Sequence, residues 1–304
     1  MLVACRYTVH TMRPTSIKAL LAVLLVALAA AIALPLVAHA KIGKPHVAAL
    51  QAALWERGHY YGTIDGLTGP LTRAALVSFQ TESGLQATGK AGASTVAALG
   101  GPARRLQGRS VAQSGDQGWD VVRLQFLLAW HGFPSGAFDG VFGERVERAT
   151  TRFQAWAGLP ADGVAGPSTF KALRKAPARP RTKLSMPIAA AIGDHFGPRS
   201  NRFHAGIDLP ADTGSPVAAV KAGTVVFAAY DEGGFGNLVV IQHRYGLTTR
   251  YAHLSEFAVV EGAQVQRGQT IGLVGSTGRS TGPHLHLEIT FRGALINPAP
   301  LLAG

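Results

Sequence analysis

The strongest constraint in this sequence is an internal duplication. A shift of 74 residues aligns residues 47–100 with residues 121–174 without a gap. Identical pairs run along the whole alignment: Leu50-Gln51 with Leu124-Gln125, Gly58 with Gly132, Asp65-Gly66 with Asp139-Gly140, Phe79-Gln80 with Phe153-Gln154, and Gly84-Leu85 with Gly158-Leu159. Chance does not keep one register over 54 positions, so this part of the chain holds two copies of one small domain.

Each copy is predicted to form three helices. Val47, Leu50 and Leu54 recur at intervals of three and four residues, as their counterparts in the second copy do, which gives one apolar face per helix. Gly58 and Gly132 follow at the position of a helix C-terminal cap. A second helix contains the Phe-Gln pair, and a short third helix begins at the Ser-Thr pair near the end of each copy. Units of roughly 55 residues are small but can fold alone.

The two copies resemble the peptidoglycan-binding domain-1 family, whose three-helix units attach wall enzymes to peptidoglycan. The family pattern ends in an Asp-Gly-x-x-Gly-Pro turn, which the second copy carries as Asp162-Gly163 and Gly166-Pro167. The first copy departs from it, with Thr88-Gly89 and with Ala93 in place of the proline. The resemblance implies peptidoglycan as a partner, and the departure weakens the case that the first copy binds it. A pair of structural spacers is the alternative.

The first forty residues have the pattern of an export signal. Arg6, Arg13 and Lys18 precede an uncharged run, residues 19–38, and the segment ends in Ala38-His39-Ala40. We expect cleavage after Ala40 and a secreted, extracellular or cell-wall-associated protein. The alternative is an uncleaved membrane anchor, because about 20 apolar residues can span a bilayer.

Cysteine use and charge limit the remaining chemistry. The single cysteine, Cys5, lies in the export segment, so any metal site in the mature chain must use nitrogen and oxygen ligands. The net charge of +12 falls to +9 without residues 1–40, and a basic exported protein is attracted to anionic wall polymers. We expect no nucleic-acid partner, because Lys and Arg cluster in the linkers and no nucleic-acid motif is visible. No soluble protein partner is evident.

After Met186 the pattern changes from helical to extended. Short β-branched runs separated by glycine now dominate, at residues 223–230, 238–242, 246–251, 270–275 and 285–291. Runs of this length and spacing predict a mostly antiparallel β domain. We therefore predict an export segment at 1–40, helical repeats at 46–100 and 119–175, linkers at 101–118 and 176–186, and a β domain at 187–304.

The β domain contains a histidine-rich strand at residues 283–289. Because side chains alternate along a strand, His284, His286 and Glu288 share one face, and the leucines and isoleucine between them share the other and can enter the core. Two imidazoles and a carboxylate on one face indicate a metal or catalytic site, although a solvated face is the alternative. A second stretch, His204-Ala-Gly-Ile-Asp208, adds an imidazole and a carboxylate, the usual non-thiol zinc ligands. The residues alone leave open which of His284 and His286 would hold a metal.

These motifs resemble the lysostaphin-type (LytM-type) zinc endopeptidases. The matching stretches are Phe196-Gly197-Pro198-Arg199, residues 203–208, Arg250 to Ser255, and Gly275 to Gly278 leading into His284-Leu285-His286. The resemblance implies one zinc ion held by His204, Asp208 and His286, and catalytic roles for His253 and His284. The chain has no His-Glu-x-x-His motif, so His253 and His284 can serve as base and oxyanion donor, and Glu288 is the rival base.

The other histidines are given structural roles. We expect His243 to cap or pack a strand end, and nothing in the spacing recruits His195 to a site. His46, His59 and His131 lie in the helical repeats and are expected on the surface. Glu288 is expected to orient a ligand imidazole or to lie on the surface.

Three functions are compatible with this organisation. The sequence predicts a secreted zinc endopeptidase that cuts peptide bonds in peptidoglycan and is held on the wall by its repeats. A wall-binding protein that activates other hydrolases would lack some of the five key side chains, and here all five are present. A zinc carboxypeptidase that trims stem peptides would need a different pattern of His, Asp and His.

Overall fold

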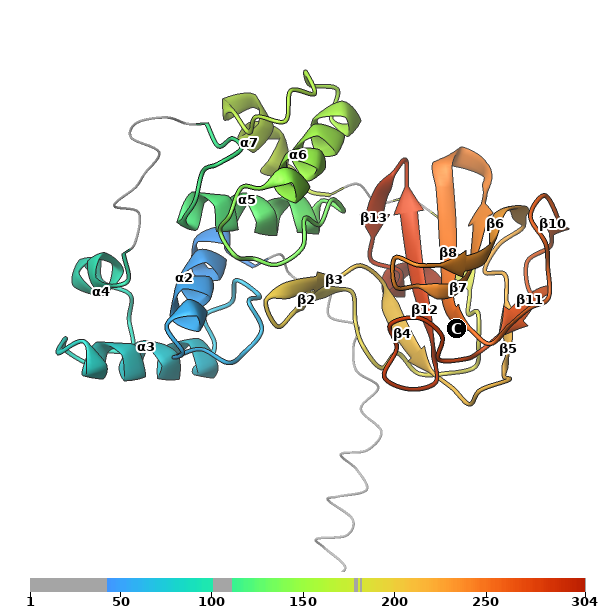
Figure 1. Ribbon diagram of the computed structural model, residues 1–304, viewed down its shortest axis with the longest axis horizontal. Coiled ribbons are helices and arrows are strands. Elements are labelled where there is room, and N and C mark those ends of the chain that lie inside the picture. Colours follow the sequence, from blue (N-terminus) through green and yellow to red (C-terminus); the bar gives the residue numbers. More distant parts are fainter. Residues whose placement is uncertain (1–42, 101–110, 178–179, 181, 304) are drawn as a thin grey trace, which may run out of the picture. The chain divides into compact units, whose positions relative to one another are not determined.

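The computed structural model describes residues 43–100, 111–177, 180 and 182–303 (Figure 1). The predicted export segment and most of the first predicted linker lie outside these residues. Within the described part, a helical region comes first and a β domain follows, which confirms the predicted fold class. No helix in the described part is long and apolar enough to span a membrane.

Each repeat contains the three predicted helices. The first repeat holds α2 (Pro45–Glu56), α3 (Pro70–Glu82) and α4 (Ala93–Ala98), and the second holds α5 (Trp119–Trp130), α6 (Glu144–Trp156) and α7 (Pro167–Leu173). Gly58 and Gly132 follow α2 and α5 with φ angles of +73° and +89°, the left-handed conformation expected just after a helix end.

A buried glutamine closes each Asp-Gly turn. The Nε2 of Gln125 donates to Oδ1 of Asp139 over 2.7 Å, and its Oε1 accepts the amide of Gly140 over 3.0 Å. Gln51 makes the equivalent bonds in the first repeat. Because every buried polar atom needs a partner, these glutamines fix the turns that follow α2 and α5.

The departure of the first repeat from the family pattern alters one such turn only slightly. In the second repeat, Nε2 of Gln154 donates to Oδ1 of Asp162 over 2.8 Å. In the first repeat, Gln80 reaches the hydroxyl of Thr88 instead, over 3.4 Å. Threonine therefore preserves the turn with a weaker contact, and the fold of the first copy survives the substitution.

One apolar cluster spans both repeats, and the second repeat has a further core of its own. Alanines of α2, including Ala48 and Ala52, pack against Phe126 and Ala129 of α5 in a single buried cluster. Small residues on α2 let the two helices approach closely, so the aromatic ring of Phe126 is fully buried. The two repeats therefore pack directly against each other.

Two histidines of the repeats are more buried than expected: the side chain of His59 is 8% exposed and packs against Phe79, and His131 departs further. His131 was expected on the surface, but its side chain is buried, with Nε2 lying 3.0 Å from the carbonyl oxygen of Leu173. The prediction was wrong because His131 caps α5 and packs edge-on against the ring of Phe153, at 5.3 Å between ring centres. Burial lowers the pKa of His131.

The β domain is built on a sheet of mainly long antiparallel strands. Its central strands are β6 (Gly223–Asp231), β7 (Gly236–Gln242), β8 (Leu247–Leu254) and β12 (His284–Phe291). The order is β10-β6-β7-β8-β12-β13, with β10 at Gln264–Val265 and β13 at Ala294–Ile296. β4 (Ile207–Pro210) pairs with the edge of β12 that faces away from β8. These strands confirm the extended runs predicted from the sequence.

Smaller elements complete the β domain. A second antiparallel sheet contains β5 (Pro216–Ala218), β11 (Thr270–Leu273) and β9 (Glu256–Phe257). The strands β2 (Gly197–Arg199) and β3 (Arg202–His204) form a hairpin, and β1 (Leu184–Ser185) pairs in parallel with β14 (Leu302–Ala303).

The β2–β3 hairpin also contacts the helical repeats. The turn carbonyls of Ser200 and Asn201 accept hydrogen bonds from the amides of Ile64 (2.9 Å) and Phe138 (2.7 Å). Trp130 of α5 packs edge-on against Phe203, with ring centres 5.5 Å apart. The hairpin is therefore held from the side of the repeats as well as by its own domain.

Alternation along β12 separates the core from the polar face as predicted. Leu285, Leu287 and Ile289 are fully buried in the apolar core of the β domain. His284, His286 and Glu288 lie on the opposite face of the strand and line a groove. The apolar side chains of β12 thus hold the strand on the core, while its polar side chains face the groove.

Candidate metal centre

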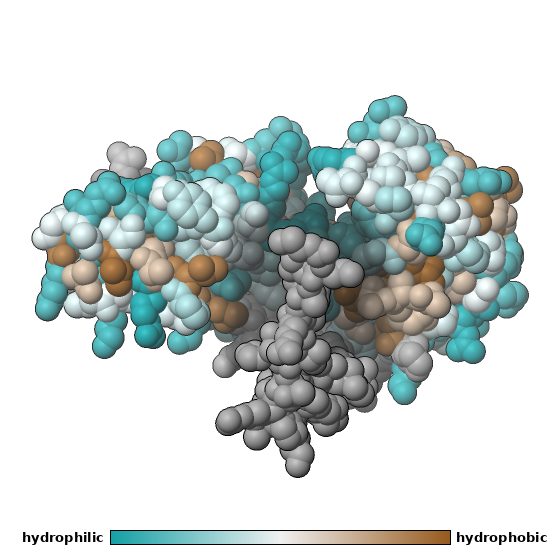
Figure 2. All heavy atoms as spheres, turned by 90° about the horizontal axis from the view of Figure 1, so that it is seen from below, coloured by the Kyte–Doolittle hydropathy of each residue, from teal (hydrophilic) through white to brown (hydrophobic). Residues whose placement is uncertain are grey.

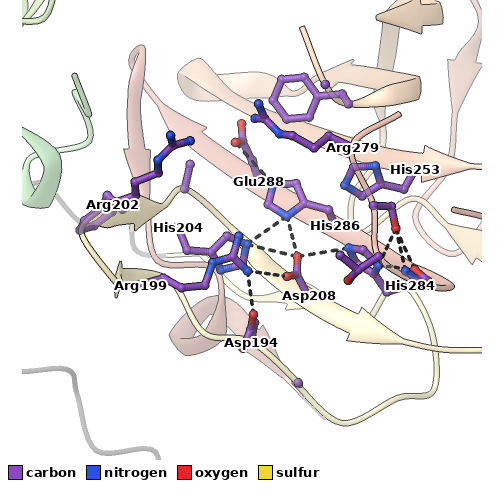
Figure 3. Close-up of a pocket in the computed structure, with 18 of the residues that line it drawn as sticks. Asp194, Arg199, Arg202, His204, Asp208, His253, Arg279, His284, His286 and Glu288 are labelled. Carbon is purple, nitrogen blue, oxygen red and sulfur yellow. Dashed lines mark hydrogen bonds and ion pairs between the residues drawn. The ribbon is translucent and has the colours of Figure 1, made fainter. Parts of the chain in front are cut away.

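Strand pairing around β12 brings the predicted metal ligands together. β4 pairs with β12 so that Asp208 lies opposite His286, and β8 pairs with the other edge of β12, where Ala252 lies opposite His286. His204 ends β3, and two residues separate it from the start of β4. Figure 3 shows His204, Asp208 and His286 turned toward one another.

Three potential ligand atoms converge on one point. Nδ1 of His286 lies 2.7 Å from Oδ1 of Asp208 and 3.2 Å from Nε2 of His204. The distance from Nε2 of His204 to Oδ1 of Asp208 is also 3.2 Å. Ligand atoms at 2.0–2.1 Å from a tetrahedral zinc ion lie about 3.3 Å apart. The geometric condition for a shared ion is therefore met, and within the described residues this is the group of side chains that could hold a metal.

The charges of this cluster are tightly coupled. Burial alone would raise the pKa of Asp208, but hydrogen bonds from His204 and His286 hold it well below its usual range. Burial opposes protonation of His286, yet the hydrogen bonds to Asp208 and Glu288 raise its pKa to about 9. A negative carboxylate therefore faces the point where a cation would sit.

Neighbouring groups fix the orientation of each potential ligand. Nδ1 of His204 donates to the backbone carbonyl of His195 over 2.9 Å, which leaves Nε2 facing the cluster. Nε2 of His286 lies 3.5 Å from Oε1 of Glu288, which leaves Nδ1 facing the cluster. Glu288 is buried and also pairs with Arg250 over 3.3 Å. Carboxylates and carbonyls placed in this way are the usual partners of metal-binding histidines.

His253 and His284 stand beside the cluster with one ring nitrogen each turned toward it. Nδ1 of His253 donates to the carbonyl of Thr277, and Nδ1 of His284 donates to the carbonyl of Gly282, both over 2.8 Å. The ring centres are 4.8 Å apart, and Nε2 of His284 lies 3.7 Å from Oδ1 of Asp208. The two free Nε2 atoms can thus reach a group bound next to the cluster.

The backbone at His253 is strained. Its φ angle is +63°, a left-handed conformation that is rare for a residue with a bulky side chain. Such strain persists only where the surrounding structure enforces it, and it concentrates at functional sites. Burial lowers the pKa of His253, and the nearby His284 and His286 lower it further, so its imidazole is neutral at neutral pH.

The cluster opens into a large groove. The groove has a volume of about 1040 Å³ and is lined by the β2–β3 hairpin, the turn at Gly233–Phe235 and the segment 279–284. His204, Asp208, His253, His284 and His286 all line it. The five predicted site residues therefore meet at one open surface.

The packing requirement for glycine at position 206 was not predicted from the sequence. A side chain at Gly206 would place its Cβ 2.4 Å from the carbonyl oxygen of Leu287 and 2.9 Å from Cε1 of His286. Only glycine lets β3 and β4 pass this close to β12, so the Gly of His-x-Gly-x-Asp is required by packing. By contrast, His243 contacts the carbonyl of Ala222 and the hydroxyl of Thr249, which matches its predicted packing role.

Comparisons with known proteins agree with this geometry. The sequence profile of peptidase family M23 matches residues 202–298, and that of a peptidoglycan binding domain matches residues 43–99 and 117–173. Residues 202–298 form a family M23 peptidase domain. The resemblance proposed from the motifs is thereby confirmed for the β domain and for both repeats.

Individual relatives match about a third of this chain. The DD-carboxypeptidase/endopeptidase Mpg of Neisseria meningitidis is 46% identical over 117 residues, which cover 36% of this chain and 27% of the relative. The peptidoglycan DD-endopeptidase ShyA of Vibrio cholerae is 48% identical over 94 residues, 31% of this chain and 22% of the relative. The chain thus spans about a quarter of the length of the curated relatives it matches.

A similar solved structure is the catalytic domain of the antimicrobial peptidase lysostaphin from Staphylococcus simulans. It is 33% identical, and the match covers 36% of this chain and 90% of the lysostaphin domain with a TM-score of 0.35.

Proposed function

We propose that this protein is a zinc-dependent endopeptidase that cuts peptide bonds in peptidoglycan, with zinc held by His204, Asp208 and His286. The observation that carries the proposal is the convergence of three ligand atoms, all within 4.8 Å of one another, at the floor of an open groove. Two imidazoles and one carboxylate form the donor set of a catalytic zinc site, which keeps a further position for water or substrate.

The roles of the two remaining histidines follow from their geometry. Zinc held by His204, Asp208 and His286 would supply a water of lowered pKa and would polarise the scissile carbonyl. His253 is neutral and presents Nε2 to the groove, so it accepts the proton of the attacking water. His284 presents Nε2 on the same side, and with Nδ1 already donating to Gly282 it donates from Nε2 to the oxyanion only as the ring that carries protons on both nitrogens.

Glu288 is not suited to act as the base. Its carboxylate is buried, 3.5 Å from the outer nitrogen of His286 and 3.3 Å from Arg250. A carboxylate in this position orients the imidazole of His286 instead of reaching the water.

The repeats support attachment to peptidoglycan outside the cytoplasm. Both match a peptidoglycan binding domain, and two relatives from Vibrio cholerae, ShyA and ShyC, are named peptidoglycan DD-endopeptidases. In the first repeat, α3 exposes the apolar side chains of Leu71 and Val77. Figure 2 shows apolar side chains exposed on one face of the molecule. We propose that the repeats raise the local concentration of substrate at the groove, and that the protein is exported by its N-terminal segment.

Two other functions compete with this proposal. The murein hydrolase activator NlpD of Salmonella dublin is 36% identical over 124 residues, so an activator without activity of its own is one alternative. The full set of five side chains favours an enzyme over an activator. The name of the Neisseria relative also joins carboxypeptidase and endopeptidase activity, so release of a terminal D-alanine is the other reaction to test.

Digestion of purified muropeptides tests the proposal directly. The full chain should convert cross-linked dimers into monomers, as followed by mass analysis, and a chelator should abolish the reaction until zinc is restored. Cleavage that resists the chelator would contradict the proposal, as would inactivity of folded, zinc-loaded protein. Loss of a terminal D-alanine from uncross-linked peptides would report the carboxypeptidase reaction in the same spectra.

Wall attachment can be tested separately with an inactive protein. The full chain carrying His286→Ala should sediment with insoluble wall sacs, because its repeats are unchanged. Recovery of this variant entirely in the supernatant would refute the anchoring role.

A further inference from the structure

The turn of the β2–β3 hairpin is held by both helical repeats at equivalent positions. The amide of Ile64 donates to the carbonyl of Ser200 over 2.9 Å, and the amide of Phe138 donates to the carbonyl of Asn201 over 2.7 Å. Ile64 and Phe138 correspond to each other under the shift of 74 residues that aligns the two repeats. The duplication therefore supplies the same backbone donor twice, once for each carbonyl of the turn.

Both donors have fixed positions in the repeats. Ile64 and Phe138 are buried and belong to the apolar cluster that spans the repeats. The ring of Phe138 packs against that of Phe126, with ring centres 5.7 Å apart. The acceptor residue Ser200 has a φ angle of +53°, a left-handed conformation that is uncommon outside glycine and persists where surrounding contacts enforce it. The hairpin turn is thus held by two rigid partners.

Trp130 of α5 extends this contact to the residues around His204. Its ring packs edge-on against Phe203, the residue before His204, with ring centres 5.5 Å apart. It packs in the same way against Phe196, at 6.5 Å between ring centres. Phe196 directly follows His195, whose backbone carbonyl accepts the hydrogen bond from Nδ1 of His204. One tryptophan of the second repeat therefore packs beside the potential ligand and beside the carbonyl that orients it.

From these contacts we infer that the repeats have a second role besides wall attachment, which is to position His204 for zinc. Trp130 is the positioning residue, and the two equivalent amides hold the turn of the hairpin that carries His204. The other two potential ligands, Asp208 and His286, lie opposite each other on strands that pair within the β domain. His204 is therefore the ligand that depends on the repeats. This inference rests on the proposed zinc site and adds to the function of the repeats.

Substitution of Trp130 in the full chain tests this role through zinc affinity. Trp130→Ala removes the ring that packs on Phe196 and Phe203, so the apparent zinc affinity should fall about tenfold, within the range seen when the support of a metal ligand is disturbed. Trp130→Phe keeps an aromatic ring at this position and should recover most of the affinity. Competition of each metal-free protein with a chelating dye measures the affinity.

Trp156→Ala is the matched control. Trp156 lies in the same repeat, and its aromatic partners are Phe133 and Phe153, with ring centres 5.9 and 6.1 Å away. Its removal should lower the unfolding midpoint, as removal of Trp130 should, but zinc affinity should stay unchanged. An equal loss of zinc affinity in both alanine variants would show that the site responds only to the stability of the repeats, and would overturn the positioning role.

Hydrogen exchange of the unmodified chain gives a second test that needs no variant to fold. Coupling between two sites is reciprocal, so a hairpin contact that favours zinc binding must itself be favoured by zinc. Added zinc should slow exchange at the amides of Ile64 and Phe138 by up to the same factor of about ten. Amides inside α6 report any general stabilisation and should slow less. Equal slowing in α6 and at the two hairpin-bound amides, or none at these two, would overturn the inference.

The failures of the two proposals are distinguishable. A folded full chain that binds no zinc would overturn the zinc peptidase itself. A chain that binds zinc and cleaves muropeptides, but keeps full zinc affinity with Trp130→Ala, would overturn the positioning role and leave the peptidase function standing.

Discussion

The helical repeats and the β domain both bury polar side chains, but they use them in opposite ways. In the repeats, Gln51 and Gln125 direct every polar atom to a partner that closes a turn. In the β domain, three side chains each direct one nitrogen or oxygen toward the same point: His204, Asp208 and His286. The other ring nitrogens of the two histidines contact the carbonyl of His195 and the carboxylate of Glu288. Burial of polar groups is common to both regions. What distinguishes the metal cluster is that its potential ligand atoms face one another.

The largest effect should follow removal of a converging atom. His286→Ala leaves two ligands for zinc, so peptidase activity should fall about 10³-fold or more and the purified protein should lose its zinc. Steady-state kinetics and elemental analysis measure the two quantities. Full zinc content in this variant would show that the three side chains do not share an ion.

A smaller effect should follow a change in the packing that brings the atoms together. Gly206→Ala would push a methyl group against Leu287 and the ring of His286, so zinc affinity should fall about 10- to 100-fold, the range seen when the support of a ligand is disturbed. Competition with a chelating dye measures this affinity. Gly143→Ala is the control, because its Cβ would meet nothing within 4 Å, and it should leave zinc affinity unchanged.

The pH dependence of metal binding should report the coupling inside the cluster. The pKa of His286 is raised to about 9 without metal, so below that pH the ring is protonated and must lose the proton from Nδ1 to bind zinc. Apparent zinc affinity should therefore rise about tenfold per pH unit between pH 6 and 8, with about one proton released per ion. Calorimetry in buffers of different ionisation heat counts the proton. Affinity that is independent of pH would contradict the raised pKa.

The smallest effect should come from the repeats, where the same kind of burial serves only stability. Gln125→Ala leaves the amide of Gly140 and the carboxylate of Asp139 without their partner, so the free energy of unfolding should fall by about 1–3 kcal/mol. Denaturant unfolding measures it. Zinc content and kcat should be unchanged, and a loss of zinc in this variant would break the distinction between the two regions.

Much of the fold could be predicted because its patterns are local. The duplication, the helix faces and the cap glycines depend on neighbours in sequence, and they matched the observed helices. The alternation along residues 284–289 also placed His284, His286 and Glu288 opposite the core before any strand partner was known.

The remaining features depend on contacts between distant segments. Spacing alone did not find His253, which reaches the site because β8 pairs with β12 and because its backbone is strained. The requirement for Gly206 arises from the approach of β12. His131 was misplaced for the same reason, since its burial depends on the ring of Phe153 and the end of α7.

A crystal structure of the full chain grown with zinc, with diffraction recorded on both sides of the zinc absorption edge, tests the central claim most directly. We expect one anomalous peak about 2.0–2.2 Å from Nε2 of His204, a carboxylate oxygen of Asp208 and Nδ1 of His286, with its remaining side facing the groove. A peak elsewhere, or none between these three side chains in zinc-saturated crystals, would contradict the account.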